Sequence, residues 1–266
     1  MKYLRHLAVA LAVYLALLGA PHPSEAGYLV AGSEDGVLYD IDPVTGLASN
    51  PRDTGLDELY GLAYSSDGIL YGADYDSLYR IDIASGATEL VGSQGPRVIA
   101  GNFDVDPVTG LLFTPGYRTE AGTRVGLLYR VDRETATATL IAEHLAGGPL
   151  AFDGSGQLFA AGGYGQGLYI LDKDTGETLS SIALSESVAP WAITFDETDT
   201  LFAVDYNLAT PTTLYAIDVS TGLVSTIGGT GLPAWPRGLA YIPEPGTLLL
   251  VALGAVACVH RKNSMS

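Results

Sequence analysis

The segment Leu38-Tyr39-Asp40-Ile41-Asp42 decides the fold, because it recurs four more times along the chain. The copies follow the order Leu-Tyr-x-apolar-Asp and span Leu78–Asp82, Leu128–Asp132, Leu168–Asp172 and Leu214–Asp218. Their tyrosines are 40, 50, 40 and 46 residues apart. Repeats of about 40–50 residues are typical of propellers and solenoids.

A second pattern precedes the first within each repeat and consists of two short apolar segments separated by a turn. In the second repeat these segments are Leu62-Ala63-Tyr64 and Leu70-Tyr71, with Asp67-Gly68 between them. Asp and Gly suit such turns, and no segment has helical periodicity. Each repeat therefore predicts four short antiparallel strands, as in a propeller blade. In the second repeat we expect them at 60–65, 69–73, 77–83 and 87–92.

The two ends of the repeat region indicate that the ring closes on itself. Tyr28–Ala31 matches the second strand of a blade, and the missing first strand appears as Leu239-Ala240-Tyr241. Pairing these segments would leave no long strand edge open. The prediction is an all-β, five-bladed β-propeller over 27–242, closed by its C-terminal strand. It is similar to the broad family of propellers with imperfect repeats, without the Trp-Asp signature of WD repeats.

Composition excludes several classes of protein. The 266 residues include 30 acidic and 13 basic side chains, which give a net charge of −17. So acidic a chain does not suit nucleic acid as a partner, and 47% hydrophobic residues exclude a disordered acidic protein. The one cysteine, Cys258, excludes a disulfide framework.

Residues 1–26 predict a secretory signal peptide. Lys2 and Arg5 precede the apolar run Leu7–Leu18, and Ser24-Glu25-Ala26 fits cleavage after Ala26. The run is shorter than the roughly 20 residues that a membrane-spanning helix needs. An uncleaved N-terminal anchor is the alternative.

Residues 243–266 form a second targeting segment. Pro243-Glu244-Pro245 is followed by the apolar run Leu248–Val259 and by Arg261-Lys262. This order resembles the PEP-CTERM sorting signal of exopolysaccharide-producing Gram-negative bacteria, although the basic end and the apolar helix are both short. A permanent C-terminal anchor is the alternative.

The resemblance implies a cellular setting and partners. It implies secretion machinery, recognition by an exosortase, export across the inner membrane of a Gram-negative bacterium and transient membrane anchoring. The protein would then reach the cell surface or the extracellular space, where an exopolysaccharide or another surface protein is the expected partner. Residues 27–245 carry a net charge of −20, because Glu25 and four of the basic residues lie outside them.

One face of the predicted propeller gathers aromatic and basic residues. The loops after the second strand and before the first strand of each blade share this face. Rings with a few polar groups suit a glycan or peptide ligand, and Arg97 and Arg237 would supply a carboxylate clamp. The alternative is that these tyrosines fill gaps between blades. The predicted ligand-binding residues are Tyr60, Tyr75, Arg97, Tyr117, Tyr164, Trp191, Tyr206, Trp235 and Arg237.

The sequence contains no clear catalytic signature. Asp74, Asp104, Asp205 and Glu58 are the carboxylates that a glycosidase would use, but the sequence does not establish their separation. His144 is the one histidine in 27–242, which excludes a multi-histidine metal site. We therefore expect no catalytic residues, metal or cofactor, with surface Ca²⁺ in the acidic turns left open.

These observations favour a non-enzymatic surface or matrix protein that binds a glycan or protein. A propeller hydrolase of the glycosidase or lactonase type is the second hypothesis, acting on extracellular polysaccharide or a small ester. A purely structural matrix component is the third.

Overall fold

The computed structural model describes residues 27–93, 101–162, 167–205, 212–233 and 235–244. Within them, Tyr28–Ile242 forms one compact unit. The second unit, Met1–Gly27 with Pro243–Ser266, lies outside the described residues apart from Gly27, Pro243 and Glu244. The expected signal helix and C-terminal apolar helix therefore fall outside the description. No helix of the described ranges has the length and apolar character needed to span a membrane.

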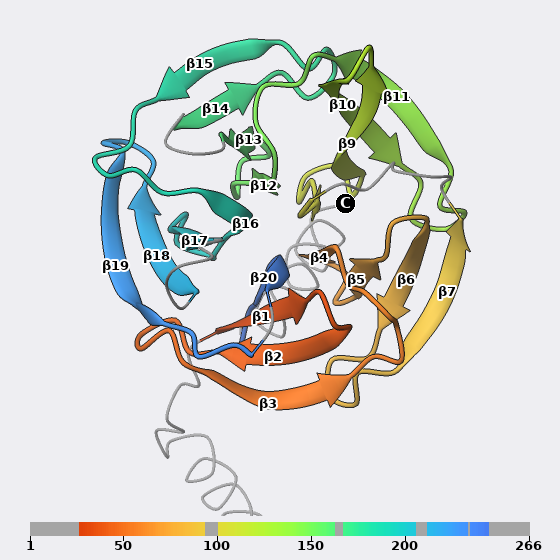
Figure 1. Ribbon diagram of the computed structural model, residues 1–266, viewed down its shortest axis with the longest axis vertical. Coiled ribbons are helices and arrows are strands. Elements are labelled where there is room, and N and C mark those ends of the chain that lie inside the picture. The colour runs from red at the N-terminus through yellow and green to blue at the C-terminus, as the bar shows by residue number, and fades with distance from the viewer. Residues whose placement is uncertain (1–26, 94–100, 163–166, 206–211, 234, 245–266) are drawn as a thin grey trace, which may run out of the picture. The chain divides into compact units, whose positions relative to one another are not determined.

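Five four-stranded antiparallel sheets are arranged in a ring around a central axis (Figure 1). This arrangement confirms the prediction of an all-β, five-bladed propeller. From the inner to the outer strand, blade 1 is β20 (Pro236–Ile242), β1 (Tyr28–Ser33), β2 (Val37–Ile41) and β3 (Ala48–Asp53), and blade 2 is β4 (Gly61–Tyr64), β5 (Leu70–Ala73), β6 (Ser77–Ile81) and β7 (Thr88–Ser93).

The other three blades repeat this order. Blade 3 is β8 (Asp104–Val105), β9 (Leu112–Glu120), β10 (Thr123–Val131) and β11 (Ala138–Glu143); blade 4 is β12 (Leu150–Phe152), β13 (Leu158–Ala161), β14 (Leu168–Leu171) and β15 (Thr178–Ile182); blade 5 is β16 (Pro190–Phe195), β17 (Leu201–Asp205), β18 (Thr213–Asp218) and β19 (Leu223–Gly229).

The C-terminal strand closes the ring as expected. β20 pairs antiparallel with β1, with Leu239 opposite Ala31 and Ile242 opposite Tyr28. The first blade therefore contains both ends of the compact unit. Because its strands come from the two ends of the sequence, the ring closes without leaving an inner edge unpaired.

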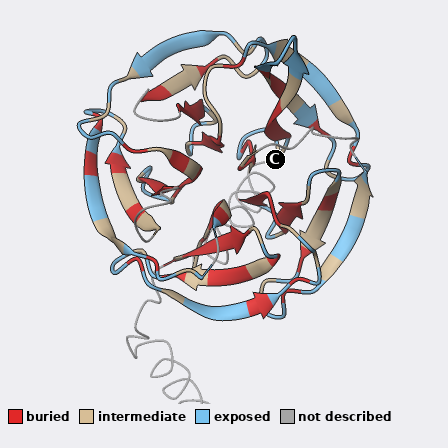
Figure 2. Cartoon of the chain, viewed as in Figure 1, coloured by how far each residue is buried: buried red, intermediate tan, exposed pale blue. Residues whose placement is uncertain are grey.

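Apolar side chains fill the space between blades. Five buried clusters contain residues of neighbouring blades, one cluster for each interface. Tyr71, Phe103, Phe113 and Phe159 are among their fully buried members. Figure 2 shows the resulting gradient, from buried inner strands to exposed outer strands. Inner strands are covered by neighbouring blades on both faces, whereas outer strands lie at the rim of the ring.

The inner strands meet at Asn102, a buried residue two positions before the start of β8. Its side-chain oxygen accepts hydrogen bonds from the main-chain N–H of Leu62 at 3.1 Å and of Leu239 at 3.0 Å. Its amide donates to the carbonyls of Ile193 at 2.7 Å and Leu239 at 3.2 Å. Its own carbonyl accepts from Leu150 N–H at 3.0 Å. Asn102 thus joins the inner strands of the other four blades to its own.

The repeated aspartates cap the turns between third and outer strands. Asp42 accepts hydrogen bonds from the N–H groups of Val44 and Thr45 at 2.7 and 3.1 Å. These bonds hold the pKa of the carboxyl below its usual value. The same N–H bonds lower the pKa of Asp132 and Asp172. In Asp82 and Asp218 the hydroxyl of Ser85 or Ser220 lowers the pKa most, and N–H bonds add to it. The interpretation of these aspartates as turn caps is confirmed.

Two structural features explain why the recurring Thr-Gly or Ser-Gly pair contains glycine. Gly86 has a φ of 80°, and a Cβ there would lie 2.8 Å from the carbonyl oxygen of Asp53 in the preceding blade. Gly46 and Gly222 repeat this arrangement against the neighbouring outer strand. The turn of one blade therefore packs on the preceding blade around the ring only if the side chain at this position is small or absent.

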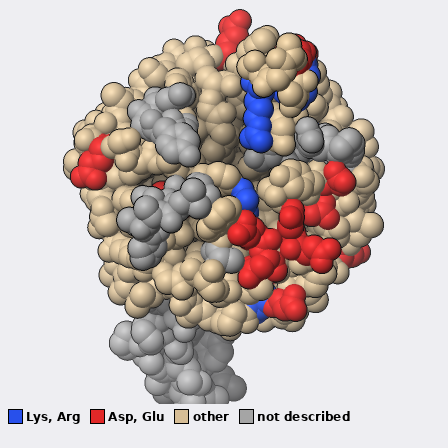
Figure 3. Space-filling model, viewed as in Figure 1, with Lys and Arg blue, Asp and Glu red and all other residues tan. Residues whose placement is uncertain are grey.

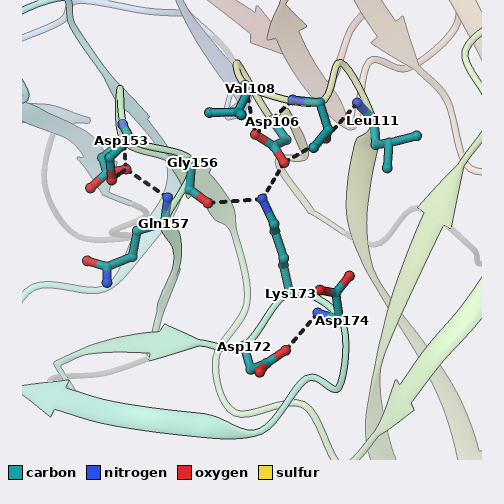
Figure 4. Close-up of polar contacts among 11 residues, drawn as sticks. Asp106, Val108, Leu111, Asp153, Gly156, Gln157, Asp172, Lys173 and Asp174 are labelled. Atoms are coloured by element: carbon teal, nitrogen blue, oxygen red, sulfur yellow. Dashed lines mark hydrogen bonds and ion pairs between the residues drawn. The ribbon is translucent and has the colours of Figure 1, made fainter.

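An ion pair joins blades 3 and 4 on the turn face. Lys173 Nζ lies 2.6 Å from Asp106 Oδ2 and 3.4 Å from the carbonyl of Gly156 (Figure 4). The Asp106 side chain is fully buried. Burial acts to raise the pKa of Asp106, but bonds from Lys173, Thr109 and Val108 outweigh it and hold the pKa below the usual value. This contact fastens the turn between β8 and β9 to the turn between β14 and β15.

The outer strand pairs carry an irregularity in every blade. The register shifts in β2–β3, β6–β7, β10–β11, β14–β15 and β18–β19. Outer strands expose one edge, and a bulge there disfavours edge-to-edge pairing with another chain.

Candidate functional site

The loops divide between two faces as the blade pattern predicts. One face carries the turns capped by aspartate. The opposite face carries the β1–β2 and β5–β6 loops together with the connections that lead into β4 and β20. On this second face, Tyr60, Tyr75, Trp191, Trp235 and Arg237 come together, and we call them the aromatic–arginine cluster.

Tyr60 and Tyr75 form one side of the cluster. Their ring centroids are 3.9 Å apart, with an angle of 43° between the ring planes. Tyr60 is buried, whereas 36% of the surface of Tyr75 is exposed. Burial, followed by the hydrogen bond to Tyr75, raises the pKa of the Tyr60 phenol well above its usual value. Tyr60 is therefore a neutral, fixed support for the exposed ring of Tyr75.

Arg237 occupies the centre of the cluster. Its Cζ lies 4.4 Å from the ring centroid of Trp191, 5.1 Å from that of Tyr60 and 5.8 Å from that of Trp235. Its Nη2 also lies 3.2 Å from Glu34 Oε2. A guanidinium stacked on rings and paired with a carboxylate is held strongly in place.

The carboxylate clamp expected from Arg97 and Arg237 is not supported at Arg237. That guanidinium already pairs with Glu34 of the β1–β2 loop, and Arg97 lies outside the described residues. The same loop is tied to the cluster by its backbone, because Glu34 N–H donates to the carbonyl of Trp235 at 2.9 Å. Arg237 is thus a structural centre for the rings around it.

A cavity of about 460 Å³ adjoins the cluster and shares Tyr75 with it. This volume lies in the range of about 300–1,000 Å³ that ligand sites occupy. In Figure 3, acidic side chains gather over blades 1 and 2. The residues lining the cavity come from the β3–β4 connection, the β5–β6 loop and β6, and are Gly55, Leu56, Asp57, Glu58, Asp74, Tyr75, Asp76 and Tyr79.

Tyr117 is the one other predicted ligand-binding residue within the described ranges. Tyr117 lies in β9 of blade 3, where Arg124 covers its ring with Cζ 4.5 Å from the centroid. Tyr164 and Tyr206 lie outside the described residues, as do Pro245, Arg261 and Lys262 of the tail. Five of the nine predicted ligand-binding residues therefore lie together in the cluster.

Three of the four carboxylates considered for catalysis, all except that of Glu58, have structural partners. Asp74 accepts hydrogen bonds from the Tyr79 hydroxyl at 2.8 Å and from Ser77 N–H at 2.7 Å. Asp205 repeats this pattern in blade 5, with the hydroxyl of Tyr215 and the N–H of Thr213. These two side chains order their loops.

Asp104 lies on the inner strand of blade 3 and joins it to blade 4. It accepts hydrogen bonds from the N–H groups of Phe152 and Val105, both at 2.8 Å. Burial raises the pKa of its carboxyl to about 7, although these two bonds oppose the rise. No set of three His, Cys, Asp or Glu side chains within the described ranges is placed to hold a metal ion.

Residues 242–262 match the PEP-CTERM protein-sorting motif. The tail is a PEP-CTERM sorting signal. The protein is therefore exported and sorted to the cell envelope or surface as an exosortase substrate. Pro243 and Glu244 of the PEP-CTERM motif follow directly after Ile242, the last residue of the ring-closing strand β20.

Solved structures share the propeller fold at low sequence identity. TolB from Acinetobacter baumannii has a TM-score of 0.51 and 18% identity over 83% of this chain, which spans 57% of the TolB chain. A protein of unknown function from Bacteroides caccae has a TM-score of 0.53 and 12% identity, covering 83% of this chain and 100% of its own.

A third similar structure comes from work on the de novo evolutionary emergence of a symmetrical protein. It has a TM-score of 0.50 and 18% identity, covering 82% of this chain and 100% of its own. At these identities the similarity shows the fold alone. A search of curated proteins found no match.

Proposed function

We propose that this chain is a non-enzymatic exported protein that binds a partner at the surface or in the matrix of a Gram-negative bacterium. The aromatic–arginine cluster carries the proposal. Trp235 and Tyr75 each expose 36% of their surface, and Tyr75 also lines the cavity. Tyr60 packs against Tyr75, and Arg237 lies beside the ring of Trp235. Exposed rings on rigid supports are typical of binding surfaces for glycans and proteins.

The binding proposal predicts that the cluster retains the propeller on the cell envelope. Residues 27–242 contain the whole ring, so this domain can be purified and sedimented with envelope fragments of the producing bacterium. Replacing Trp235 and Tyr75 together with alanine is expected to weaken retention at least tenfold. Each lost ring removes a large apolar contact.

Tyr117→Ala provides the matched control, because Tyr117 lies on β9 of another blade and stacks with Arg124. This variant is expected to sediment as the wild type does. If the Trp235 and Tyr75 variant sediments equally well, the cluster is not the binding site.

The sorting signal predicts removal of the C-terminal tail. Mass spectrometry of the protein recovered from the cell surface is expected to find no peptide from the residues after the Pro-Glu-Pro segment. Replacing Arg261 and Lys262 with alanine removes the basic end of the signal, and this variant is expected to remain unprocessed. Recovery of wild-type surface protein that still ends at Ser266 would contradict processing.

A further inference from the structure

We propose that the cavity beside Tyr75 receives an arginine side chain from a protein partner. The inference deepens the proposed binding function and rests on it, because it names the chemistry of the partner at the same face. It is carried by the cavity, the rings that adjoin it and the charge of its lining.

The chain contains an example of this recognition next to the cavity. Arg237 lies on the ring of Trp191 and beside Tyr60, with its guanidinium paired to Glu34. Aromatic faces and carboxylates together suit a planar guanidinium, because the rings attract its charge and the carboxylate accepts its N–H groups.

The cavity repeats these components for a group from outside. Tyr75 and Tyr79 supply aromatic surface, and Asp57, Glu58 and Asp76 supply carboxylates. None of these three carboxylates pairs with a lysine or arginine of the described ranges. By contrast, the fourth carboxylate, that of Asp74, is held by hydrogen bonds within its own loop.

The negative charge of the cavity lining determines which kind of ligand it attracts. Four acidic side chains around one cavity repel an anionic ligand, such as an acidic polysaccharide, and attract a cation. A guanidinium fits the rings as well as the carboxylates, whereas an ammonium is more strongly hydrated and stacks less well. The partner is therefore a protein segment with an exposed arginine near its contact point.

A peptide titration tests this choice. The probe is acetyl-Gly-Arg-Gly-Arg-Gly-amide, and the matched control contains citrulline in place of arginine, which keeps the shape and removes the charge. Both tryptophans of the sequence, Trp191 and Trp235, lie in the cluster, so intrinsic fluorescence reports on this face. The arginine peptide is expected to bind at least tenfold more tightly than the citrulline peptide.

Substitutions in the lining provide the second arm. Asp57→Asn with Asp76→Asn removes two charges from side chains that make no hydrogen bond with another described residue, and is expected to weaken peptide binding at least tenfold. Asp174→Asn with Glu177→Gln makes the same change of charge on exposed residues of the turn face, and binding is expected to stay as in the wild type.

The outcomes separate this inference from the proposed function. Equal affinity for the citrulline and arginine peptides, or tighter binding of a glucosamine tetramer, would overturn the choice of an arginine. If envelope retention depends on Trp235 and Tyr75 but not on Asp57 and Asp76, the arginine inference fails alone. If retention depends on none of these four residues, both fail.

Discussion

Replacing Asn102 with alanine is expected to lower the free energy of unfolding by about 4 kcal/mol. The substitution leaves four buried backbone groups without their partners, namely the N–H of Leu62, the carbonyl of Ile193 and both groups of Leu239. Each unsatisfied buried group costs about 1–3 kcal/mol, and a water molecule in the space left behind recovers part of the sum. Guanidinium unfolding of purified residues 27–242, followed by circular dichroism, measures the change.

Two variants make this result specific to the hydrogen bonds of Asn102. Asn102→Asp keeps the size of the side chain but loses its amide donors and buries a charge, so it is also expected to destabilise the ring. Glu89→Ala changes an exposed residue of β7 and is expected to stay within about 0.5 kcal/mol of the wild type. The central role of Asn102 would be wrong if Asn102→Ala unfolded at the same denaturant concentration as Glu89→Ala.

Replacing Lys173 with methionine is expected to lower the free energy of unfolding by about 2 kcal/mol at pH 7. The substitution removes the cation that lies 2.6 Å from the fully buried Asp106 and leaves that carboxylate without its charged partner. The expected loss is moderate because 27% of the Lys173 side chain is exposed, so solvent already screens the pair. Denaturant unfolding at several pH values measures it.

The pH dependence of this loss has a definite sign. In the wild type the pKa of Asp106 is lowered, so its contribution to stability is present above the unfolded pKa of about 4 and is lost as the pH falls through the folded pKa. The difference between Lys173→Met and the wild type is therefore expected to shrink between pH 7 and pH 3.

Arg133→Met is the matched control for Lys173. Arg133 holds the equivalent position in the turn of blade 3 and pairs with Asp67 at 3.1 Å, but 51% of the Asp67 side chain is exposed. A loss below about 1 kcal/mol is expected for such a pair. If both substitutions cost the same at pH 7, burial of Asp106 does not determine the strength of the pair.

The sequence was sufficient to predict the blades because each one is built from local signals. The alternating apolar residues, the capping aspartates and the Thr-Gly turns all lie within about 40 residues of one another, and each repeat supplies the same set. The order of strands in a blade also determines which loops share a face. The repeat pattern therefore predicts that five residues lie on one face, namely Tyr60, Tyr75, Trp191, Trp235 and Arg237.

The contacts that order the site join residues far apart in the sequence. Arg237 and Glu34 are 203 residues apart, and Asn102 bonds to Leu239 across 137 residues. Repeat patterns place such residues at the same end of the ring but do not determine which side chains pair. One signal in the sequence marks Asn102, because it is an amide where the equivalent positions of the other inner strands hold Gly61, Pro149, Ala192 and Gly238.

Blade 3 departs most from the repeat. Its inner strand β8 has two residues, whereas β9 and β10 have nine each. The step of 50 residues between Tyr79 and Tyr129 indicates an insertion, and most of it lies in the long β9–β10 hairpin. Tyr117 lies in that hairpin, so its spacing from Phe113 does not bring it to the cluster as the spacing in blade 2 does for Tyr75.

Acrylamide quenching of tryptophan fluorescence tests the binding face most directly. Trp191 and Trp235 are the two tryptophans of the sequence, and Trp235 exposes 36% of its surface in the unbound propeller. When purified residues 27–242 are bound to envelope fragments, the quenching constant is expected to fall, because the partner covers Trp235. A bound propeller with the same quenching constant as the unbound protein would place the contact elsewhere and contradict the proposed binding face.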